Sequence, residues 1–254
     1  MDYQKAFENI SIVLVRPKYS TNIGSSARAM KNMGLTNLIV VNPVDYDQEK
    51  AKKLSTHAAQ DVLDNAVFSD NLDDALKDFS FCIGTTARIG KQRSLIMSSP
   101  EQAAENILSL VQNNKIAILF GPEDKGLENI ELKRCHQLVT IDTEEFSSLN
   151  LSQAVMIISY EIAKAMKEPP EFHIPVLANR FQLDSMYEHL KEILIKIDFI
   201  HPENPDHWLD NFRTFFSRQD MRAKDVNILR GVLRQIDWYG NHMFELGRNS
   251  AKNQ

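Results

Sequence analysis

Polar residues in three separate segments have types and positions that could do chemistry. Asn22 and Arg28 lie in "NIGSSAR", Glu123 lies in "GPEDKGL", and Ser148 and Asn150 lie in "SSLNLSQA". Each segment follows a short apolar run that predicts a buried strand. In open α/β sheets, ligands bind beyond the carboxyl ends of the strands. We therefore expect these side chains at one rim of a sheet, where a fourth segment, "GTTARIGKQR", would also lie.

The segment around Arg28 predicts the first turns of a helix. We interpret Asn22 as the N-cap of that helix and Gly24 as a residue that lets another group come close. Small residues flank Arg28 and leave room for a backbone or a ligand (Ser25, Ser26, Ala27 and Ala29). Because the free N–H groups of a helix N-terminus bind phosphate, this segment has the chemistry of an anion site.

The elements that must position these residues alternate between strands and helices. Strands are predicted from short runs that are apolar on both faces, at 10–16, 37–42, 81–86, 115–121 and 137–142. Helices are predicted between them, at 22–33, 48–65, 100–112 and 129–135. This alternation predicts an α/β fold with an open parallel sheet and helices on both faces.

The last third of the chain has a different pattern. A long apolar helix is predicted at 149–167, and the three prolines of "EPPEFHIPVLANR" stop it. We interpret residues 1–167 as one domain, 168–180 as a linker and 181–254 as a helical extension, because the extension has apolar residues at helical spacing and no strand signal.

Composition and missing motifs exclude several classes of function. The 254 residues carry a formal charge of −5, which argues against coating nucleic acid by bulk attraction. No apolar run is long enough for a membrane span, and no signal-peptide pattern occurs. The two cysteines have no paired spacing, which indicates a reducing compartment. We therefore expect a cytoplasmic protein. Dinucleotide and P-loop fingerprints, a serine nucleophile elbow and a metal-ligand cluster are all absent from the sequence.

Taken together and in this order, "NIGSSARAMKNMG", "LFGPEDKGL" and "SLNLSQAV" resemble the three signature motifs of the SPOUT superfamily of RNA 2′-O-ribose methyltransferases. The resemblance is closest to the TrmH-like group and, within it, to the TrmJ family. The segment "VNILRGVLRQI" also resembles the helical C-terminal extension of that family. It implies S-adenosylmethionine as the cofactor, a homodimer, and a trefoil-knotted domain. Since un-knotted connections are the rule, the knot is implied by the resemblance alone.

The resemblance also implies roles for individual residues. Arg28, Asn22, Glu123, Ser148 and Asn150 would be catalytic, with Glu123 orienting Arg28 and the small residues beside Arg28 giving clearance to an RNA backbone. The cofactor would lie against small or apolar residues: Thr85, Thr86, Ala87, Gly121, Ile141, Ser147, Ser148 and Leu149. RNA would contact basic residues on strand-end loops: Arg16, Lys18, Arg88, Lys91 and Arg93.

The implied reaction is attack of a ribose 2′-hydroxyl on the methyl carbon of S-adenosylmethionine, with tRNA as substrate and the pyrimidine at position 32 of the anticodon loop as target. The alternatives are a 2′-O-methyltransferase of the same fold that acts on ribosomal RNA, and a non-catalytic RNA-binding module of that fold. Arg28 either passes on a proton with help from a nearby phosphate or Glu123, or stays charged, stabilises the developing alkoxide and positions the phosphate. The C-terminal helices either grip RNA or support a dimer.

Overall fold

The computed structural model describes residues 3–87, 96–144, 149–167, 176–201, 205–216 and 220–252. The chain forms two compact units, Met1–Val176 and Leu177–Gln254. The division between them falls in the stretch that joins the last helix of the first unit, which ends at Lys167, to the first helix of the second, which begins at Arg180.

The first unit is built on a seven-stranded sheet in which every pairing is parallel. The strand order is β3-β2-β1-β6-β4-β7-β5. The strands are β1 (Ile10–Val15), β2 (Asn37–Val41), β3 (Val67–Ser69), β4 (Phe81–Thr85), β5 (Ile96–Ser98), β6 (Ile116–Phe120) and β7 (Gln137–Val139). The predicted open parallel sheet is thereby confirmed. Two edge strands, β3 and β5, were not predicted, because three residues give no readable periodicity and β3 exposes Val67 and Phe68.

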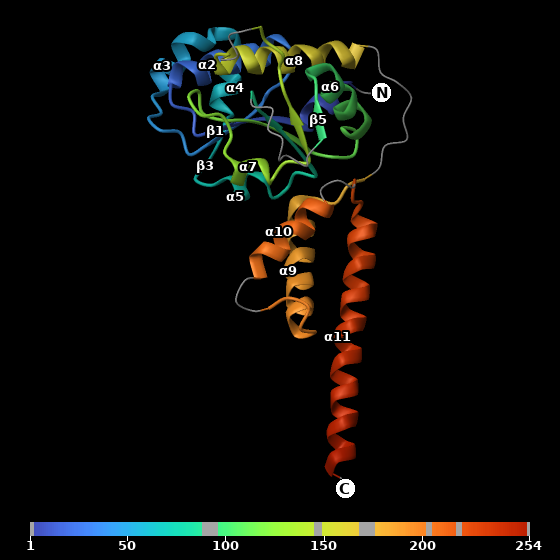
Figure 1. The fold of residues 1–254 in the computed structure, drawn as a ribbon. Helices are drawn as coiled ribbons and strands as arrows, with labels where there is room; N and C mark the ends of the chain where they lie inside the picture. The colour runs from blue at the N-terminus through green and yellow to red at the C-terminus, as the bar shows by residue number, and fades with distance from the viewer. Residues whose placement is uncertain are drawn as a thin grey trace. The chain divides into compact units, whose positions relative to one another are not determined.

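Helices cover both faces of the sheet, as predicted (Figure 1). They are α1 (Tyr3–Glu8), α2 (Ser20–Asn32), α3 (Gln48–Ser55), α4 (Gln60–Asp64), α5 (Leu72–Leu76), α6 (Pro100–Leu110), α7 (Asn129–Leu132) and α8 (Leu151–Lys167). Figure 1 places α2, α6 and α8 on one face and α5 and α7 on the other. On the α5 and α7 side, Val13 and Leu119 of the sheet pack in one buried cluster with Leu76 and Leu132.

The single helix predicted over 48–65 is wrong, because the chain breaks there into α3, a 3₁₀ turn at His57–Ala59, and α4. The break lies at Thr56, whose φ of 62° is not helical and is a conformation that a β-branched residue rarely adopts. Apolar spacing does not reveal such a break, since the buried residues Ala51, Ala59 and Val62 on either side of it all face the core.

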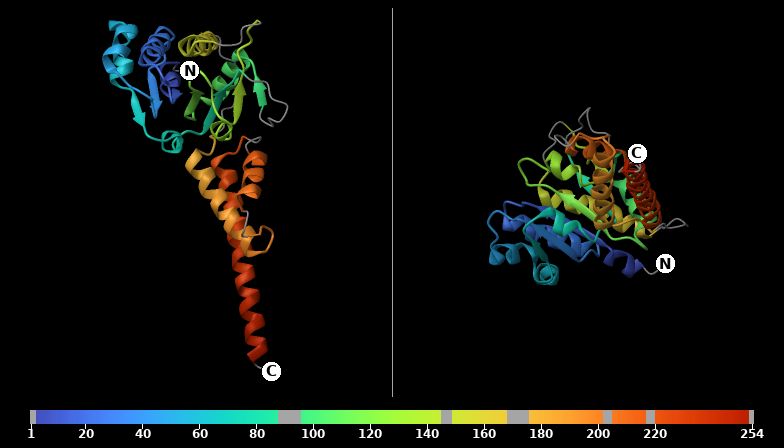
Figure 2. Two further views of the ribbon diagram at one scale, coloured as in Figure 1. Left: turned by 60° about the vertical axis from the view of Figure 1, so that its left-hand side comes forward. Right: turned by 90° about the horizontal axis from the view of Figure 1, so that it is seen from below.

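The second unit is helical, as predicted. It contains α9 (Arg180–Lys196), α10 (Pro205–Phe216) and α11 (Ala223–Lys252). Residues of all three helices share a small core that includes Leu183, Tyr187, Leu209 and Val226. Figure 2 shows α11 continuing well past α9 and α10. Within the described ranges of both units, no helix combines the length and apolarity needed to cross a membrane.

Candidate functional site

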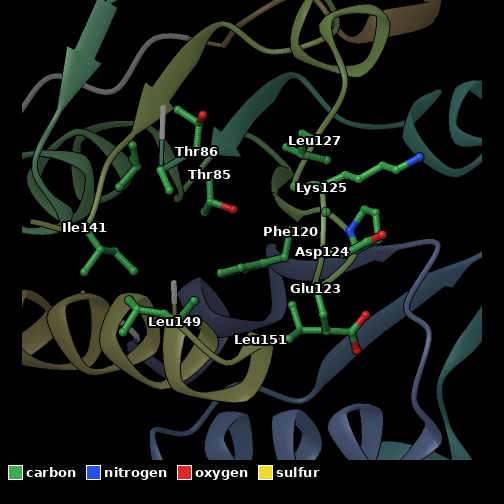
Figure 3. A pocket seen from close by; sticks show the side chains of 16 residues that line it. Thr85, Thr86, Phe120, Glu123, Asp124, Lys125, Leu127, Ile141, Leu149 and Leu151 are labelled. Carbon is green, nitrogen blue, oxygen red and sulfur yellow. The ribbon is translucent and has the colours of Figure 1, made fainter. Parts of the chain in front are cut away.

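A cavity of about 280 Å³ lies beyond the carboxyl ends of β4, β6 and β7 (Figure 3). Six of the residues predicted to hold the cofactor line this cavity: Thr85, Thr86, Ala87, Gly121, Ile141 and Leu149. The other two, Ser147 and Ser148, lie outside the described residues. The structure therefore brings together residues from three loops that are far apart in the sequence.

The cavity also has walls that sequence reasoning missed. Phe120, Val139, Leu151 and Ala154 line it, and Figure 3 shows Phe120 between Thr85 on one side and Leu149 on the other. Phe120 and Val139 were interpreted only as buried strand residues. They are the last residues of β6 and β7, and that position at the sheet rim was the signal that could have identified them.

The loop that closes one side of the cavity, residues 121–127, depends on two glycines. A Cβ atom on Gly121 would overlap the backbone of Gly126 and Leu127, so the loop folds back directly on its own start. Gly126 has a φ of 66°, a conformation that favours glycine. Its N–H donates to the carbonyl oxygen of Pro122 at 2.8 Å. This tight turn places Glu123 among the residues that line the cavity.

Glu123 accepts hydrogen bonds from the segment that begins α2. Its Oε1 accepts from Asn22 Nδ2 at 2.7 Å, and its Oε2 accepts from the backbone N–H of Lys18 at 2.9 Å. In Figure 3 the carboxylate points away from Phe120. Both carboxylate oxygens are thus engaged in fixing the loop of Glu123 to the start of α2.

Asn22 also receives a hydrogen bond from the start of α8. Its Oδ1 accepts from Asn150 Nδ2 at 3.1 Å. Asn150 in turn caps α8, because its Oδ1 accepts from the backbone N–H of Ser152 at 2.9 Å and its backbone N–H donates to Gln153 Oε1 at 3.1 Å. The cap fixes which end of the Asn150 amide faces Asn22. A directional chain therefore runs from Asn150 through Asn22 to Glu123, and we call these three residues the amide–carboxylate network.

The interpretation of Asn22 as an N-cap is wrong. Helix α2 begins at Ser20, and its N-cap is Tyr19, which makes no side-chain capping bond. Ser20 fixes this end instead: its Oγ donates to the carbonyl oxygen of Asp45 at 2.9 Å and accepts from the N–H of Asp47 at 2.8 Å. Because Asn22 lies inside the first turn, its side chain is available for Glu123 and Asn150.

The small residues of α2 serve the protein core. A Cβ atom on Gly24 would overlap the carbonyl of Ala51 in α3, and Ser26, Ala27 and Ala29 are buried. The expectation that they clear space for an RNA backbone is therefore wrong for these residues. Arg28 is exposed on the same helix. The carboxylate of Glu123 is bonded to Lys18 and Asn22 rather than to Arg28 in the described part of the chain.

The two described basic residues among the predicted RNA contacts both form ion pairs. The Arg16 guanidinium pairs with Glu128 at 3.3 Å and with the buried Glu131, so it is committed to holding α7. Lys18 Nζ donates to Asp124 at 2.6 Å on the exposed rim. This hydrogen bond raises the pKa of Lys18 and lowers the pKa of Asp124. Arg88, Lys91 and Arg93 lie outside the described residues.

Comparison with known proteins gives two matching families. Residues 9–160 match the SpoU rRNA methylase family, and residues 181–250 match the C-terminal domain of the tRNA methyltransferase TrmJ. A protein of Cronobacter sakazakii named tRNA (cytidine/uridine-2′-O-)-methyltransferase TrmJ is 37% identical over 238 residues, which cover 91% of this chain and 96% of that protein.

Solved structures agree with this assignment. The crystal structure of TrmJ from Z. mobilis superposes with a TM-score of 0.77 at 31% identity, covering 89% of this chain and 98% of that one. A probable methylase from Haemophilus influenzae superposes with a TM-score of 0.59 at 33% identity, covering 93% and 99%. The resemblance found in the three motifs is confirmed: the chain belongs to the SpoU rRNA methylase family and, within it, to the TrmJ family.

Proposed function

We propose that this protein transfers the methyl group of S-adenosylmethionine to a ribose 2′-hydroxyl of tRNA. The observation that carries the proposal is the amide–carboxylate network, which joins Asn22, Glu123 and Asn150 from the three motif segments and in which Glu123 lines the cavity. Family membership supports the same chemistry, because the named relatives are tRNA 2′-O-methyltransferases.

The lining of the cavity suits the cofactor chemically. Small-ligand pockets are mostly apolar with a few placed polar groups. Phe120, Ile141, Leu149 and Leu151 supply apolar walls here, and the hydroxyl-bearing Thr85 and the 121–127 loop supply polar groups. S-Adenosylmethionine would bring an electrophilic methyl group to this cavity. Ser147 and Ser148 belong to this proposed site by motif position.

The residues of the network would orient the substrate. Both oxygens of Glu123 accept from N–H donors, so its charge holds the first turn of α2 against the loop of residues 121–127. Arg28 is exposed on that helix, and a guanidinium stays charged at any working pH. We therefore assign Arg28 the electrostatic role, in which it stabilises the developing alkoxide and holds the phosphate beside it.

The proposed target is a pyrimidine nucleotide of tRNA, at position 32 of the anticodon loop. The relatives are named as methyltransferases of cytidine and uridine. Position 32 of the tRNA follows from the resemblance to the TrmJ family. The proposed assembly is a homodimer in the cytoplasm, with residues 1–167 as the methyltransferase domain, 168–180 as a linker and 181–254 as the helical extension.

Two measurements test the function together. Isothermal titration calorimetry with S-adenosylmethionine measures cofactor binding, and transfer of labelled methyl to bulk tRNA and to ribosomal RNA measures activity and substrate class. We expect cofactor binding and labelling of tRNA. Labelling of ribosomal RNA alone would show that ribosomal RNA, and not tRNA, is the substrate. Cofactor binding without methyl transfer would favour a non-catalytic RNA-binding module. A folded protein that binds no cofactor would overturn the proposal.

A further inference from the structure

Tyr19 is a large aromatic side chain that the structure leaves in solvent beside the proposed site. Its side chain is 59% exposed. It precedes α2 directly, and the residue before it, Lys18, donates its backbone N–H to Glu123. Single exposed apolar side chains are common on proteins, so the position of Tyr19 beside the amide–carboxylate network is what makes its exposure informative.

The backbone on both sides of Tyr19 is fixed. The carbonyl oxygen of Tyr19 accepts from the N–H of Asn22 at 2.9 Å, and the N–H of Val44 donates to the carbonyl oxygen of Pro17 at 3.1 Å. Ser20 is held by the backbone of the 45–47 loop. The ring is thus mounted on a rigid segment, which lowers the entropy that a ligand would lose by ordering it.

The segments next to Tyr19 carry apolar surface and charges of both signs, because Lys18 is paired with Asp124 and lies beside Glu123. Val44, on the adjoining loop, is 58% exposed. The ammonium of Lys18 lies on the exposed rim, and its pairing with Asp124 uses one of three N–H donors. An unpaired nucleotide presents a matching group, because its base has a flat apolar face. Proteins commonly recognise unpaired RNA bases by stacking them on aromatic side chains.

We propose that Tyr19 is a stacking platform for an unpaired base of the substrate RNA, at or next to the nucleotide whose ribose is methylated. The inference rests on the proposed function and adds a substrate contact to it. Stacking a base on an aromatic ring changes affinity by roughly five- to 150-fold per base. Tyr19 therefore raises the affinity for RNA, while the cofactor binds in the cavity without it.

Variants at Tyr19 separate aromatic stacking from other roles. Tyr19→Phe and Tyr19→Trp keep a stacking face, Tyr19→Leu keeps apolar area without a ring, and Tyr19→Ala removes both. Tyr160→Ala is the matched control, since Tyr160 on α8 is 52% exposed. We expect KM for tRNA to rise at least fivefold in the Leu and Ala variants, with kcat, the Kd for S-adenosylmethionine and the oligomeric state unchanged. The Phe, Trp and control variants should behave as wild type.

RNA substrates that lack one base identify the stacked partner. An abasic nucleotide is placed in turn at the methylated position and at each neighbour. At the stacked position we expect the wild-type enzyme to lose as much affinity as Tyr19→Ala does, and the abasic RNA and the variant together to lose no more. The proposal would be overturned if the affinity losses from the abasic RNA and from Tyr19→Ala were additive at every position, or if the Ala and wild-type proteins had equal KM for tRNA. Dissociation of a dimer by Tyr19→Ala would also overturn it, because the ring would then make a protein contact. If wild-type protein methylates no RNA, the proposed function fails first.

Discussion

At the scale of residues, the site depends on the direction in which amide groups donate. Asn150 can donate to Asn22 because its oxygen is already engaged as the cap of α8. Asn22 can donate to Glu123 because its own oxygen has accepted from Asn150. The chain ends at a carboxylate, which only accepts hydrogen bonds, so the side-chain amide N–H₂ groups of Asn150 and Asn22 each have an acceptor. The geometry of the candidate site is therefore linked to the start of the long helix α8.

Substitutions of Asn150 should separate these two tasks. Asn150→Ala removes the cap and the bond to Asn22, so we expect a loss of about 1 kcal/mol in the free energy of unfolding. Asn150→Ser restores a capping oxygen but cannot reach Asn22, so stability should return while methyl transfer stays roughly two- to tenfold below wild type. Thermal unfolding and kcat/KM measure the two effects. Full activity in the Ser variant would show that the Asn150–Asn22 bond has no catalytic importance.

Arg28→Lys tests whether a planar guanidinium is required. A lysine keeps the charge but loses the bidentate geometry with which arginine holds a phosphate. We expect kcat/KM to fall by about tenfold or more, with the Kd for S-adenosylmethionine unchanged. Arg28→Ala should lose more than Arg28→Lys. Substantial activity in the Lys variant would count against a guanidinium-specific role.

The candidate site residues could be predicted where they follow a strand, and less well where they act through partners. Thr85, Gly121 and Ile141 were implied by the resemblance of the motifs, at segments that the sheet rule places beyond strand ends, and they line the cavity. The bonds of Asn22 to Glu123 and to Asn150 join residues 101 and 128 positions apart. No local pattern in the sequence encodes contacts at such separations, so Asn22 was misinterpreted as a cap.

At the scale of elements, close packing of α2 on α3 sets the position of the helix that carries Asn22 and Arg28. Gly24 faces the carbonyl of Ala51 with no room for a side chain, and the clamp at Ser20 fixes the end of the helix. The network residue Asn22 lies between these two anchors. Small residues in α2 thus act on the site through the position of the helix.

Gly24→Ala should destabilise the protein by about 1–3 kcal/mol, since the added methyl group must push two backbones apart. The matched control is Gly240→Ala in α11, where an added Cβ has no neighbour within 4 Å. That control should stabilise its helix by about 1 kcal/mol. Urea unfolding followed by circular dichroism measures both changes. A neutral Gly24→Ala variant would contradict the close approach of α2 and α3.

The helical unit should lose stability at high pH because of Tyr187. Burial raises the pKa of Tyr187 to about 12, whereas an unfolded tyrosine titrates near 10. The folded state therefore holds the proton more tightly, so stability is full below about pH 10 and falls as the pH rises toward 12. Thermal melts between these values should show the fall, and Tyr187→Phe should flatten it. Equal slopes in both proteins would contradict the burial of this hydroxyl.

At the scale of the whole molecule, the sequence predicts the layers better than their order. Five strands and the helical second unit follow from runs and periodicities that match the structure. The strand order β3-β2-β1-β6-β4-β7-β5 does not follow from these patterns. Each apolar run is equally apolar on both faces, so any strand could lie beside any other. The order matters for function, since it brings β4, β6 and β7 side by side under the cavity.

The most direct measurement is identification of the methylated nucleoside by mass spectrometry after reaction of purified protein with tRNA and S-adenosylmethionine. We predict that label appears in 2′-O-methylcytidine or 2′-O-methyluridine from the anticodon loop, and that Arg28→Ala abolishes it while still binding the cofactor. Label on a base rather than a ribose, or no label with a folded protein that binds S-adenosylmethionine, would contradict assignment of this site as a ribose methyltransferase.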